Sequence, residues 1–542
     1  MTNGPGDSSA TLHATEVLIV GGGISALVAA AELANRGKSV TILERKDRSW
    51  LGGQARDAFG GIFFVGSPEQ RRAGIRDSME LAWEDWQGYA EFGPRDAHQR
   101  SWARHYIERC IPDVREYLVG KGLGFVPVAN WAERAADGRG NRVPRFHLLW
   151  GCGPGLVAAL LREVERHEGS RITIRCEHRV DGLIVENDVV VGVRGAGPDG
   201  EFEARAEHVV IAGGGRTGDL AKVRESWPRD AWGNPPGDLL AGVWPHLDGA
   251  LHDAAADAGA SLTNLSNMWV YAAGITHLDA EFDGDGLAII PPKSALWLTA
   301  DGSRFTPPLL AGYDTREAVA RICTSEHPWS WLVLNRRVLA KEIAVQSARF
   351  NPAFRDRRYL KVAQDLLIGN KALAALLVDR SPDVVTAPDL SALAFRMMEI
   401  SPEVPIDTAA LTRAVVEYDA EIGRGRKLFT DAQLVSLRNI RAFLGDRVRM
   451  TAFAPIASGP LSKRGDLVAI RLRPVVRKTL GGIETDLACR VVRPDGSVLP
   501  GLYAIGEAAG FGGGGMNGKR TLEGTLLGGC IFTARELARQ IP

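Results

Sequence analysis

The stretch EVLIVGGGISALVAAAELANRGKSVTILER, residues 16–45, constrains the fold more than any other part of the chain. VLIV and VTIL are short β-branched runs of the kind found in buried parallel strands. Between them, the alanine-rich LVAAAELA favours a helix, and Gly37 lies where that helix would end. Strand, glycine turn, helix and strand in this order predict the start of an α/β domain with a parallel sheet.

The glycines of this turn have the spacing of a nucleotide-phosphate site. Gly21 and Gly23 permit a tight turn and a close backbone approach to a pyrophosphate, and the following helix offers free N–H groups to the anion. Ala26 stands where the third glycine of the motif allows close packing of helix on strand. Glu44 ends the second strand, where a carboxylate accepts hydrogen bonds from ribose hydroxyls. The combination predicts a dinucleotide site.

Paired glycines follow directly after the second strand, in SWLGGQARDAFGGIFF. An NAD enzyme does not need such a run at this place, whereas a flavin needs backbone close beside its ring system. Near the C-terminus, GLYAIGEAAG supplies another strand that ends in Gly506–Glu507, and a carboxylate there suits ribityl hydroxyls. The sequence therefore predicts FAD as the cofactor.

Composition excludes several classes of protein. The chain has 65 Lys and Arg against 65 Asp and Glu, and this zero net charge argues against a nucleic-acid partner, which would normally require a basic surface. The six cysteines form no CxxC pair, so we expect neither a disulfide framework nor a metal site. A reducing, cytoplasmic location fits this pattern of cysteines.

Neither a targeting signal nor a membrane span is expected. The N-terminus, MTNGPGDSSATLHAT, has no basic region and no twin arginine, so residues 1–14 are predicted to form a disordered leader. The most apolar stretch, residues 17–34, is interrupted by three glycines and by Glu32.

Changes in local amino-acid composition along the chain indicate two domains. HVVIAGGG and GLYAIGEAAG read as further strands of the first domain, whereas the region between them holds Trp and Pro clusters and helix-like stretches such as RRVLAKEIAVQSARF. We predict an FAD-binding domain built from residues 15–264 and 456–542, interrupted by a cap domain at 265–455. The expected fold class is α/β, with a discontinuous Rossmann-like FAD-binding domain on a parallel sheet plus an inserted α+β cap that helps to form the substrate site.

The chain resembles the fumarate reductase/succinate dehydrogenase-type FAD flavoproteins, in particular the branch of 3-ketosteroid dehydrogenases. The resemblance covers most of the chain and rests on VLIVGGGISALVAAAEL, GGQARDAFGGIFFVGSPEQRRAGIRDS, RFHLLWGCGPGL, VVIAGGG, RKTLGGIETD and LYAIGEAAGFGGGGMNGKRTLEGTLLGG. It implies that flavin N5 exchanges a hydride with one carbon while a protein group moves a proton at the adjacent carbon. The net reaction would interconvert CH–CH and C=C.

The resemblance also implies which residues bind FAD. The last helix, which starts near Leu526 and Leu527, would turn its free N–H groups toward the flavin pyrimidine and stabilise negative charge on the reduced ring. The FAD-binding residues implied in this way are Gly21, Gly23, Ser25, Ala26, Glu44, Arg45, Gly52, Gly53, Gly60, Gly61, Gly506, Glu507, Leu526 and Leu527.

The expected substrate pocket departs from the fumarate reductase pattern. Where that family has a His–Pro pair this chain reads SNMWVY, and where it has a second histidine this chain has Lys478. Gly312 and Tyr313 occupy the place of its proton-donating arginine, and Arg520 is similar to an arginine that clamps a dicarboxylate, one residue out of register. Because a C4 dicarboxylate requires two charged clamps, the sequence argues against fumarate as the substrate.

Tyr313 is similar to the tyrosine that removes the α proton in ketosteroid dehydrogenases. A phenol has a pKa near 10, so it needs a cationic neighbour to act as a base at neutral pH. Arg520, Lys478 and Arg477 are the candidates for that neighbour, and a tyrosine with a purely structural role is the alternative. Tyr271, beside the missing histidine, is a second choice for the base.

Two further groups complete the predicted catalytic set. His147, in RFHLLWGCG, would shape the pocket or donate a proton, unless it is a packed core histidine. The backbone N–H groups of Gly512 to Gly515 would polarise the carbonyl of a ketone as its enolate forms.

The sequence thus predicts an FAD-dependent dehydrogenase or reductase that acts on a CH–CH bond next to a ketone, in a bulky apolar small molecule. A C=C reductase or a flavin oxidase is the alternative within enzymes, and a flavin-binding protein without catalysis is the alternative outside them. The sequence does not identify the external electron acceptor, and it leaves a homo-oligomer open.

Overall fold

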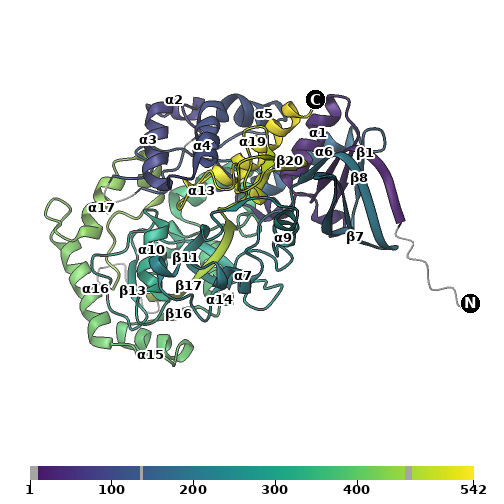
Figure 1. The fold of residues 1–542 in the computed structure, drawn as a ribbon. Coiled ribbons are helices and arrows are strands. Elements are labelled where there is room, and N and C mark those ends of the chain that lie inside the picture. The colour runs from purple at the N-terminus through teal and green to yellow at the C-terminus, as the bar shows by residue number, and fades with distance from the viewer. Residues whose placement is uncertain (1–9, 128, 135–137, 458–466) are drawn as a thin grey trace, which may run out of the picture.

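Two β-sheets organise the molecule, whose computed structural model describes residues 10–127, 129–134, 138–457 and 467–542 (Figure 1). The first sheet has a parallel core in the order β20, β8, β1, β2 and β5, as the predicted α/β class requires. Antiparallel β19, β6 and β7 extend it. Its strands are β1 (Ala10–Val20), β2 (Val40–Leu43), β5 (Ile172–Arg175), β6 (Arg179–Glu186), β7 (Val189–Gly197), β8 (Gly200–Ile211), β19 (Arg490–Val492) and β20 (Val498–Ala504).

The first strand, glycine turn and helix form as predicted. In β1 the side chains of Val17, Leu18 and Ile19 are fully buried, as expected for a parallel strand covered on both faces. Helix α1 (Ile24–Asn35) follows, and Gly37 with φ +90° supplies the left-handed residue after its end.

Strand β1 begins earlier than expected. Its first residues, Ala10 to Leu12, pair in parallel with Phe202 to Ala204 of β8, so residues 10–14 are ordered and the prediction of a disordered leader to residue 14 is wrong for them. The reason is that β8 extends beyond the sheet core and offers these residues a hydrogen-bonding partner. Residues 1–9 lie outside the described residues.

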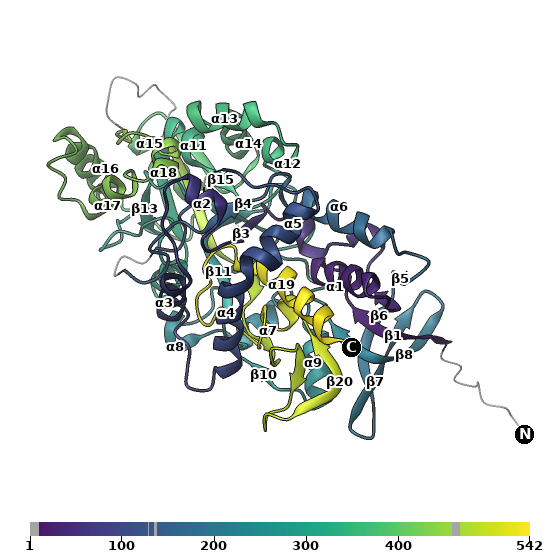
Figure 2. The same cartoon turned by 90° about the horizontal axis from the view of Figure 1, so that it is seen from above.

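The end of the chain returns to the first sheet. Strand β20 pairs in parallel with β8, and helix α19 (Thr525–Gln540) lies beside α1, which both views show as a yellow helix against a purple one (Figures 1 and 2). Two segments separated by the whole cap domain therefore complete one domain.

The cap is built on a mostly antiparallel sheet in the order β13, β14, β17, β11, β12 and β15, to which β16 and β9 add. Its strands are β9 (Leu240–Ala241), β11 (Met268–Thr276), β12 (Gly286–Ile290), β13 (Leu296–Thr299), β14 (Ser330–Asn335), β15 (Ala344–Val345), β16 (Val384–Ala387) and β17 (Leu467–Thr479). Because β17 is central in this sheet, the cap sheet extends past residue 455, where the sequence placed the return to the first domain. Residues 458–466, next to that boundary, lie outside the described residues.

Helices cover the cap sheet and gather at the end of the molecule remote from β7 (Figure 2). They are α10 (Thr315–Cys323), α11 (Arg336–Glu342), α12 (Pro352–Arg355), α13 (Tyr359–Ile368), α14 (Lys371–Arg380), α15 (Leu390–Ile400), α16 (Thr408–Gly423), α17 (Ala432–Ile440) and α18 (Leu444–Arg449). The single helix expected over 336–350 stops at Glu342 because Ala344 and Val345 pair with β12.

A further group of helices precedes the cap in sequence and packs against α19 and the first domain (Figure 2). It comprises α2 (Pro68–Arg72), α3 (Met79–Ala90), α4 (Ala97–Arg109), α5 (Glu116–Gly120) and, after the short strands β3 (Gly61–Phe63) and β4 (Phe146–Leu148), α6 (Cys152–Glu165). None of the helices in the described ranges is long and apolar enough to cross a membrane.

Candidate active site

A cavity of about 780 Å³, here called the interdomain cavity, is lined by residues of both the first domain and the cap. The first domain contributes the turn between β1 and α1, the paired glycines after β2, and the start of α19. The cap contributes residues of β11, β12, α13 and α18.

One end of the cavity has the features of a phosphate and ribose site. Helix α1 begins at Gly23 with no side-chain cap, so its first N–H groups are left for a ligand. Glu44 accepts a hydrogen bond from the Gly22 N–H at 2.7 Å and another from Lys46 at 2.8 Å, which fix its carboxylate beside the turn. Burial raises the pKa of Glu44 above its usual value, while these hydrogen bonds oppose the shift.

The paired glycines have a packing role as well as a lining role. A Cβ at Gly52 would lie 2.5 Å from the Val157 side chain, and one at Gly61 would lie 1.9 Å from the Phe146 ring. Both glycines line the cavity, so backbone forms the cavity wall at these two positions. A larger side chain at either position would displace the neighbouring Val157 or Phe146.

A polar cluster of Gln54, Lys478 and Glu507 lies along this wall. Lys478 donates to the Gln54 side-chain oxygen, its Nζ lies 3.5 Å from Glu507 Oε2, and Gln54 Nε2 donates to the same carboxylate at 3.3 Å. Burial lowers the pKa of Lys478, and the charge of Glu507 opposes this. The cluster offers a carboxylate, an amide and an ammonium group to a polyol or a ring carbonyl.

The start of α19 provides a second uncapped helix end. Gly524 precedes it with φ +98° and no side-chain cap, and a Cβ there would lie 2.6 Å from the backbone N of Phe63. Leu526 and Leu527 in its first turn line the cavity. Two uncapped helix N-termini, a ribose carboxylate and a backbone wall fit the diphosphate, ribose and ring of FAD.

Most residues expected to bind FAD are gathered in the cavity wall. Ala26 does not line the cavity. It is buried where α1 packs against its neighbours, which is the packing role that the third motif position predicts. Gly506 lies just behind the wall, where a Cβ would be 2.3 Å from Ser25 Oγ. The predicted residues that line the cavity are Gly21, Gly23, Ser25, Glu44, Arg45, Gly52, Gly53, Gly60, Gly61, Glu507, Leu526 and Leu527.

Of the side chains predicted for catalysis, Lys478 lines the cavity, whereas Tyr313 and Arg520 are held elsewhere. Tyr313 packs against the hydrophobic cluster under α16 and α17 and has Ser436 as a hydrogen-bond partner, and burial raises its pKa. Arg520 pairs with Glu91 at 2.5 Å and with Asp314 at 2.8 Å. The structure therefore does not bring Tyr313 and Arg520 together as a base and its cationic neighbour.

His147 is a packed histidine. Side chains alternate along β4, so Phe146 and Leu148 line the cavity while His147 points the other way and is fully buried. Its Nδ1 lies 2.7 Å from the Arg145 carbonyl oxygen and its Nε2 lies 2.7 Å from Ser67 Oγ, so the ring donates through Nδ1 and accepts through Nε2. Burial lowers the pKa of His147 to about 4.

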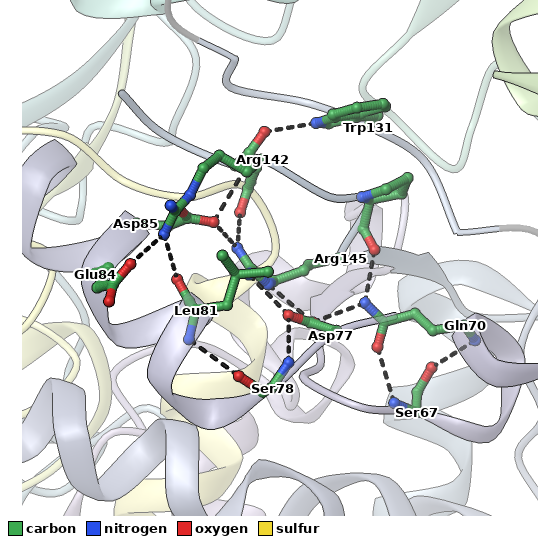
Figure 3. A network of polar contacts seen from close by, with 12 residues as sticks. Ser67, Gln70, Asp77, Ser78, Leu81, Glu84, Asp85, Trp131, Arg142 and Arg145 are labelled. Atoms are coloured by element: carbon green, nitrogen blue, oxygen red, sulfur yellow. Dashed lines mark hydrogen bonds and ion pairs between the residues drawn. The ribbon is translucent and has the colours of Figure 1, made fainter. Parts of the chain in front are cut away.

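The network that holds β4 is closed and ionic (Figure 3). Arg145 is completely buried and pairs with Asp77 at 2.8 Å and with Asp85 at 2.6 Å. Arg142 also pairs with Asp85, and Gln70 bridges Asp77 to Ser67 in the same view (Figure 3). These contacts position the strand whose other face forms part of the cavity.

The oxyanion site expected from Gly512 to Gly515 is not formed, because all four N–H groups are already bonded within the chain. Gly512 and Gly514 both donate to the Ala509 carbonyl at 2.9 Å, Gly515 donates to Gly512 at 3.1 Å, and Gly513 donates to Thr485 Oγ1 at 3.1 Å. Their glycine identity is explained by packing, since a Cβ at Gly512 would lie 2.8 Å from the Trp102 ring.

A tyrosine–carboxylate pair does face the cavity. Tyr271 of β11 donates to Glu523 Oε1 at 2.5 Å, and Trp269 Nε1 donates to the same oxygen at 3.2 Å. All three residues line the cavity, and Glu523 directly precedes the uncapped end of α19. Burial raises the pKa of Glu523, and burial together with the charge of Glu523 raises that of Tyr271 well above 10.

A second buried carboxylate, Glu133, lines the same cavity. It accepts hydrogen bonds from the hydroxyls of Tyr89 and Thr315, the latter at 2.6 Å. Burial, with a smaller contribution from the charge of Glu523, raises the pKa of Glu133 to about 8. The sequence analysis assigned no role to Glu133 or Glu523, although the position of Glu523 just before GTLLGG is a usable signal.

Comparisons with known proteins agree with this geometry. The family described as FAD binding domain matches residues 16–527. The chain is 42% identical to a KsdD-like steroid dehydrogenase of Mycobacterium tuberculosis (strain ATCC 25618 / H37Rv), over 99% of this chain and 98% of that protein. It is also 42% identical to a KsdD-like steroid dehydrogenase of Mycolicibacterium smegmatis, over 94% of this chain and 96% of the relative.

Solved structures share the fold at lower sequence identity. The 3-ketosteroid delta1-dehydrogenase from Sterolibacterium denitrificans, in complex with 1,4-androstadiene-3,17-dione, matches with a TM-score of 0.70 and 16% identity, over 98% of this chain and 99% of that one. The 3-ketosteroid-delta4-(5alpha)-dehydrogenase from Rhodococcus jostii RHA1 matches with a TM-score of 0.65 and 19% identity, over 99% and 98%. The two-domain arrangement of sheet and cap is thus a known one.

Proposed function

This chain belongs to the FAD-binding-domain family, and we propose that it is an FAD-dependent dehydrogenase that introduces a C=C bond next to the carbonyl of a steroid-like ketone. The observation that carries the proposal is the Tyr271–Glu523 pair, which faces the cavity directly beside the start of α19. Support for a steroid comes from the relatives with 42% identity, which are named as steroid dehydrogenases.

The cofactor site of this proposal uses mainly backbone. The N–H groups at the start of α1 would hold the diphosphate, Glu44 would accept from a ribose, and Gln54 and Glu507 would contact the ribityl chain or ring. Bound FAD supplies the acceptor for a hydride from the carbon β to the carbonyl. The N–H groups at the start of α19 would stabilise negative charge on the ring.

Tyr271 and Glu523 are proposed to remove the α proton. As Tyr271 Oη accepts the proton from the α carbon, it passes its own proton to Glu523 Oε1, with which it is already hydrogen-bonded. The electron pair of the broken C–H bond stays on the substrate. Because Tyr271 has a raised pKa, it acts as a relay with Glu523 as the final acceptor, and no free tyrosinate is required.

The shape and lining of the cavity favour a bulky apolar ketone. Beyond the polar groups near α19 and the charged side chains of the cap, the cap contributes an apolar wall to the cavity. Examples of these wall residues are Ile289, Phe354, Val362, Leu366 and Leu373. The proposal includes a cytoplasmic location, which the six free cysteines support.

Anaerobic mixing with a 3-ketosteroid tests the proposal, with flavin absorbance as the readout. The wild-type holoenzyme should lose its oxidised-flavin band, and Tyr271→Phe should slow this loss by about 10²-fold while keeping its FAD. Tyr313→Phe is the matched control, because its hydroxyl lies outside the cavity lining and its rate should stay within about twofold. A Tyr271→Phe enzyme with the wild-type rate would eliminate the proposed relay, and a flavin that no ketosteroid reduces would eliminate the function.

A further inference from the structure

Cations crowd one part of the interdomain cavity, on the cap side. Lys293 Nζ pairs with Asp446 Oδ1 at 2.7 Å, and Arg134 pairs with the other oxygen of the same carboxylate. Arg449 lies on α18 together with Asp446 and also lines the cavity. We call Lys293, Arg134, Asp446 and Arg449 the cap cation cluster.

Three members of this cluster line the cavity that also holds the tyrosine–carboxylate pair. Lys293 follows the end of β12, the strand that pairs with the Tyr271-bearing β11 in the cap sheet. Lys293, Asp446 and Arg449 line the same cavity as Tyr271 and Glu523. Both groups therefore border the space that is open to a ligand in this cavity.

Positive charge exceeds negative charge in the cluster. Asp446 is the one carboxylate shared by Lys293 and Arg134, and Arg449 has no carboxylate partner among the described residues, its contact being Asn130 Oδ1 at 3.3 Å. Burial lowers the pKa of Lys293, and repulsion from Arg134 and Arg449 adds to this effect against the attraction of Asp446. Arg134 and Arg449 are thus close enough to Lys293 to disfavour its charge.

Neighbouring carboxylates do not supply the missing charge. Glu342 lines the cavity, but both its oxygens are occupied by neutral donors: Ser294 Oγ at 2.7 Å, the Ser294 N–H at 3.0 Å, and the N–H and hydroxyl of Thr451 at 2.7 and 2.6 Å. Glu133 is bonded to hydroxyl groups of Tyr89 and Thr315. With Glu342 added to Asp446, three cations still face two carboxylates.

Building on the proposed function, we propose that the cap cation cluster binds a carboxylate carried by the substrate, away from the carbons that react. The preferred substrate is then a steroid-like ketone with an acidic side chain. Arg449 provides the principal contact, because it is the cluster cation without a carboxylate partner among the described residues and its guanidinium can form a paired hydrogen bond with a carboxylate. Lys293, which also lines the cavity, adds positive charge.

A matched pair of substrates tests this inference: a 3-ketosteroid with a side-chain carboxylic acid, and its methyl ester. For the wild type, KM for the acid should be lower than for the ester by about tenfold, with similar kcat, because a charge-assisted hydrogen bond forms with the acid alone. Arg449→Gln should abolish this preference by raising KM for the acid and leaving the ester unchanged. Arg447→Gln is the matched control, since Arg447 is exposed on the same helix and does not line the cavity.

Direct binding separates this inference from the proposed function. Flavin-absorbance titrations of the Tyr271→Phe holoenzyme give dissociation constants for the acid and the ester when turnover is slow or absent. If ketosteroids are not oxidised but the acid still binds about tenfold more tightly than the ester in an Arg449-dependent way, the subsite stands and the reaction fails. Equal affinities of the wild-type pocket for acid and ester, or an equal loss for both in Arg449→Gln, would overturn the subsite.

A third arm separates a substrate-borne carboxylate from a free anion. Sodium acetate, compared with sodium chloride at the same ionic strength, should leave turnover of the ester unchanged, because acetate is not attached to the ketone. Specific activation by acetate would reassign the cluster to a free anion and overturn the substrate class proposed here. Lys293→Gln combined with Asp446→Asn removes one charge of each sign together, and it should reduce the preference for the acid less than Arg449→Gln does.

Discussion

Two groups of buried carboxylates, one beneath β4 and one in the cavity, differ in the partners that surround them. Beneath β4, Asp77 and Asp85 are matched by the guanidinium of Arg145 (Figure 3). In the cavity, Glu133 and Glu523 receive hydrogen bonds from phenol, hydroxyl and indole groups, with no ion pair to either carboxylate among the described residues.

This difference in partners indicates a structural role for the carboxylates beneath β4 and a chemical role for those in the cavity. A guanidinium offers each carboxylate a charge-assisted hydrogen bond, so Asp77 and Asp85 serve as fixed contacts for Arg145. Neutral donors compensate burial only in part, so the pKa of Glu133 rises to about 8 and that of Glu523 also rises. A carboxylate whose pKa is raised in this way is a stronger base once it is ionised and can accept a substrate proton. Burial alone does not distinguish the two groups of carboxylates.

The strongest way to test the cavity side of the comparison is Glu523→Gln. The amide keeps the size of the side chain but cannot accept the proton from Tyr271, so flavin reduction by a ketosteroid should slow by about 10³- to 10⁴-fold. The measurement is stopped-flow flavin absorbance without oxygen. Because the substituted amide still offers an oxygen to Tyr271 and Trp269, the thermal unfolding midpoint and FAD content should be preserved.

The pH dependence of the wild type provides the internal control for this variant. Glu523 works as a base in its deprotonated form, and its pKa is raised from 4.5 by burial. The rate should therefore fall as pH decreases through a value above 4.5, and Glu523→Gln should lose this acidic limb. A variant with both the wild-type rate and the wild-type limb would assign the base to another group.

The structural side of the comparison is tested by Arg145→Met. This change leaves the buried Asp77 without its counter-charge and Asp85 with Arg142 alone, so the free energy of unfolding should drop by about 3 to 5 kcal/mol. Urea unfolding followed by fluorescence measures it. Arg142→Met is the matched control: Arg142 is partly exposed, and its loss should cost about 1 kcal/mol or less.

The rate of flavin reduction distinguishes the effect of Arg145→Met from that of Glu523→Gln. The folded fraction of Arg145→Met should reduce its flavin at nearly the wild-type rate, because Arg145 reaches the cavity only through the strand that it supports. A large loss of rate in an Arg145→Met variant of full stability would show that the network beneath β4 takes part in the chemistry. The two groups of carboxylates would then not differ in role.

The contrast also explains how much the sequence can predict. The phosphate turn lies within residues 16–45, so local pattern is enough to predict its strand, glycines, helix and Glu44 in the correct arrangement. Tyr271 and Glu523 are 252 residues apart, and they meet only because β11 of the cap lies over the turn before α19. Local pattern carries no information on such a contact, which is set by tertiary packing.

Glycine-rich segments predict the cavity wall correctly at Gly52 and Gly61 but lead to a wrong prediction of an oxyanion site at Gly512 to Gly515. Gly52 and Gly61 lie in the cavity wall as expected, although packing against Val157 and Phe146 also requires them. Gly512 to Gly515 look equally free in sequence, but a tight turn uses the N–H groups of Gly512, Gly514 and Gly515, and that of Gly513 donates to Thr485 Oγ1. Whether an N–H group is free depends on the turn that the backbone adopts, which composition does not specify.

The smallest expected effect concerns His147, which lies at the junction of the two regions. Its folded-state pKa is about 4 against 6.5 when exposed, so the unfolded chain binds a proton that the folded chain does not between these values. Stability from this group is fully present above pH 6.5 and is lost as pH falls toward 4, by about 3 kcal/mol in total.

His147→Gln, which can still donate to the Arg145 carbonyl and accept from Ser67, should flatten the pH dependence of urea unfolding in this window. Flavin reduction at pH 7 should be unchanged, since His147 points away from the cavity; a variant that folds normally but reduces its flavin slowly would instead place this histidine in the chemistry, as the sequence alone suggests.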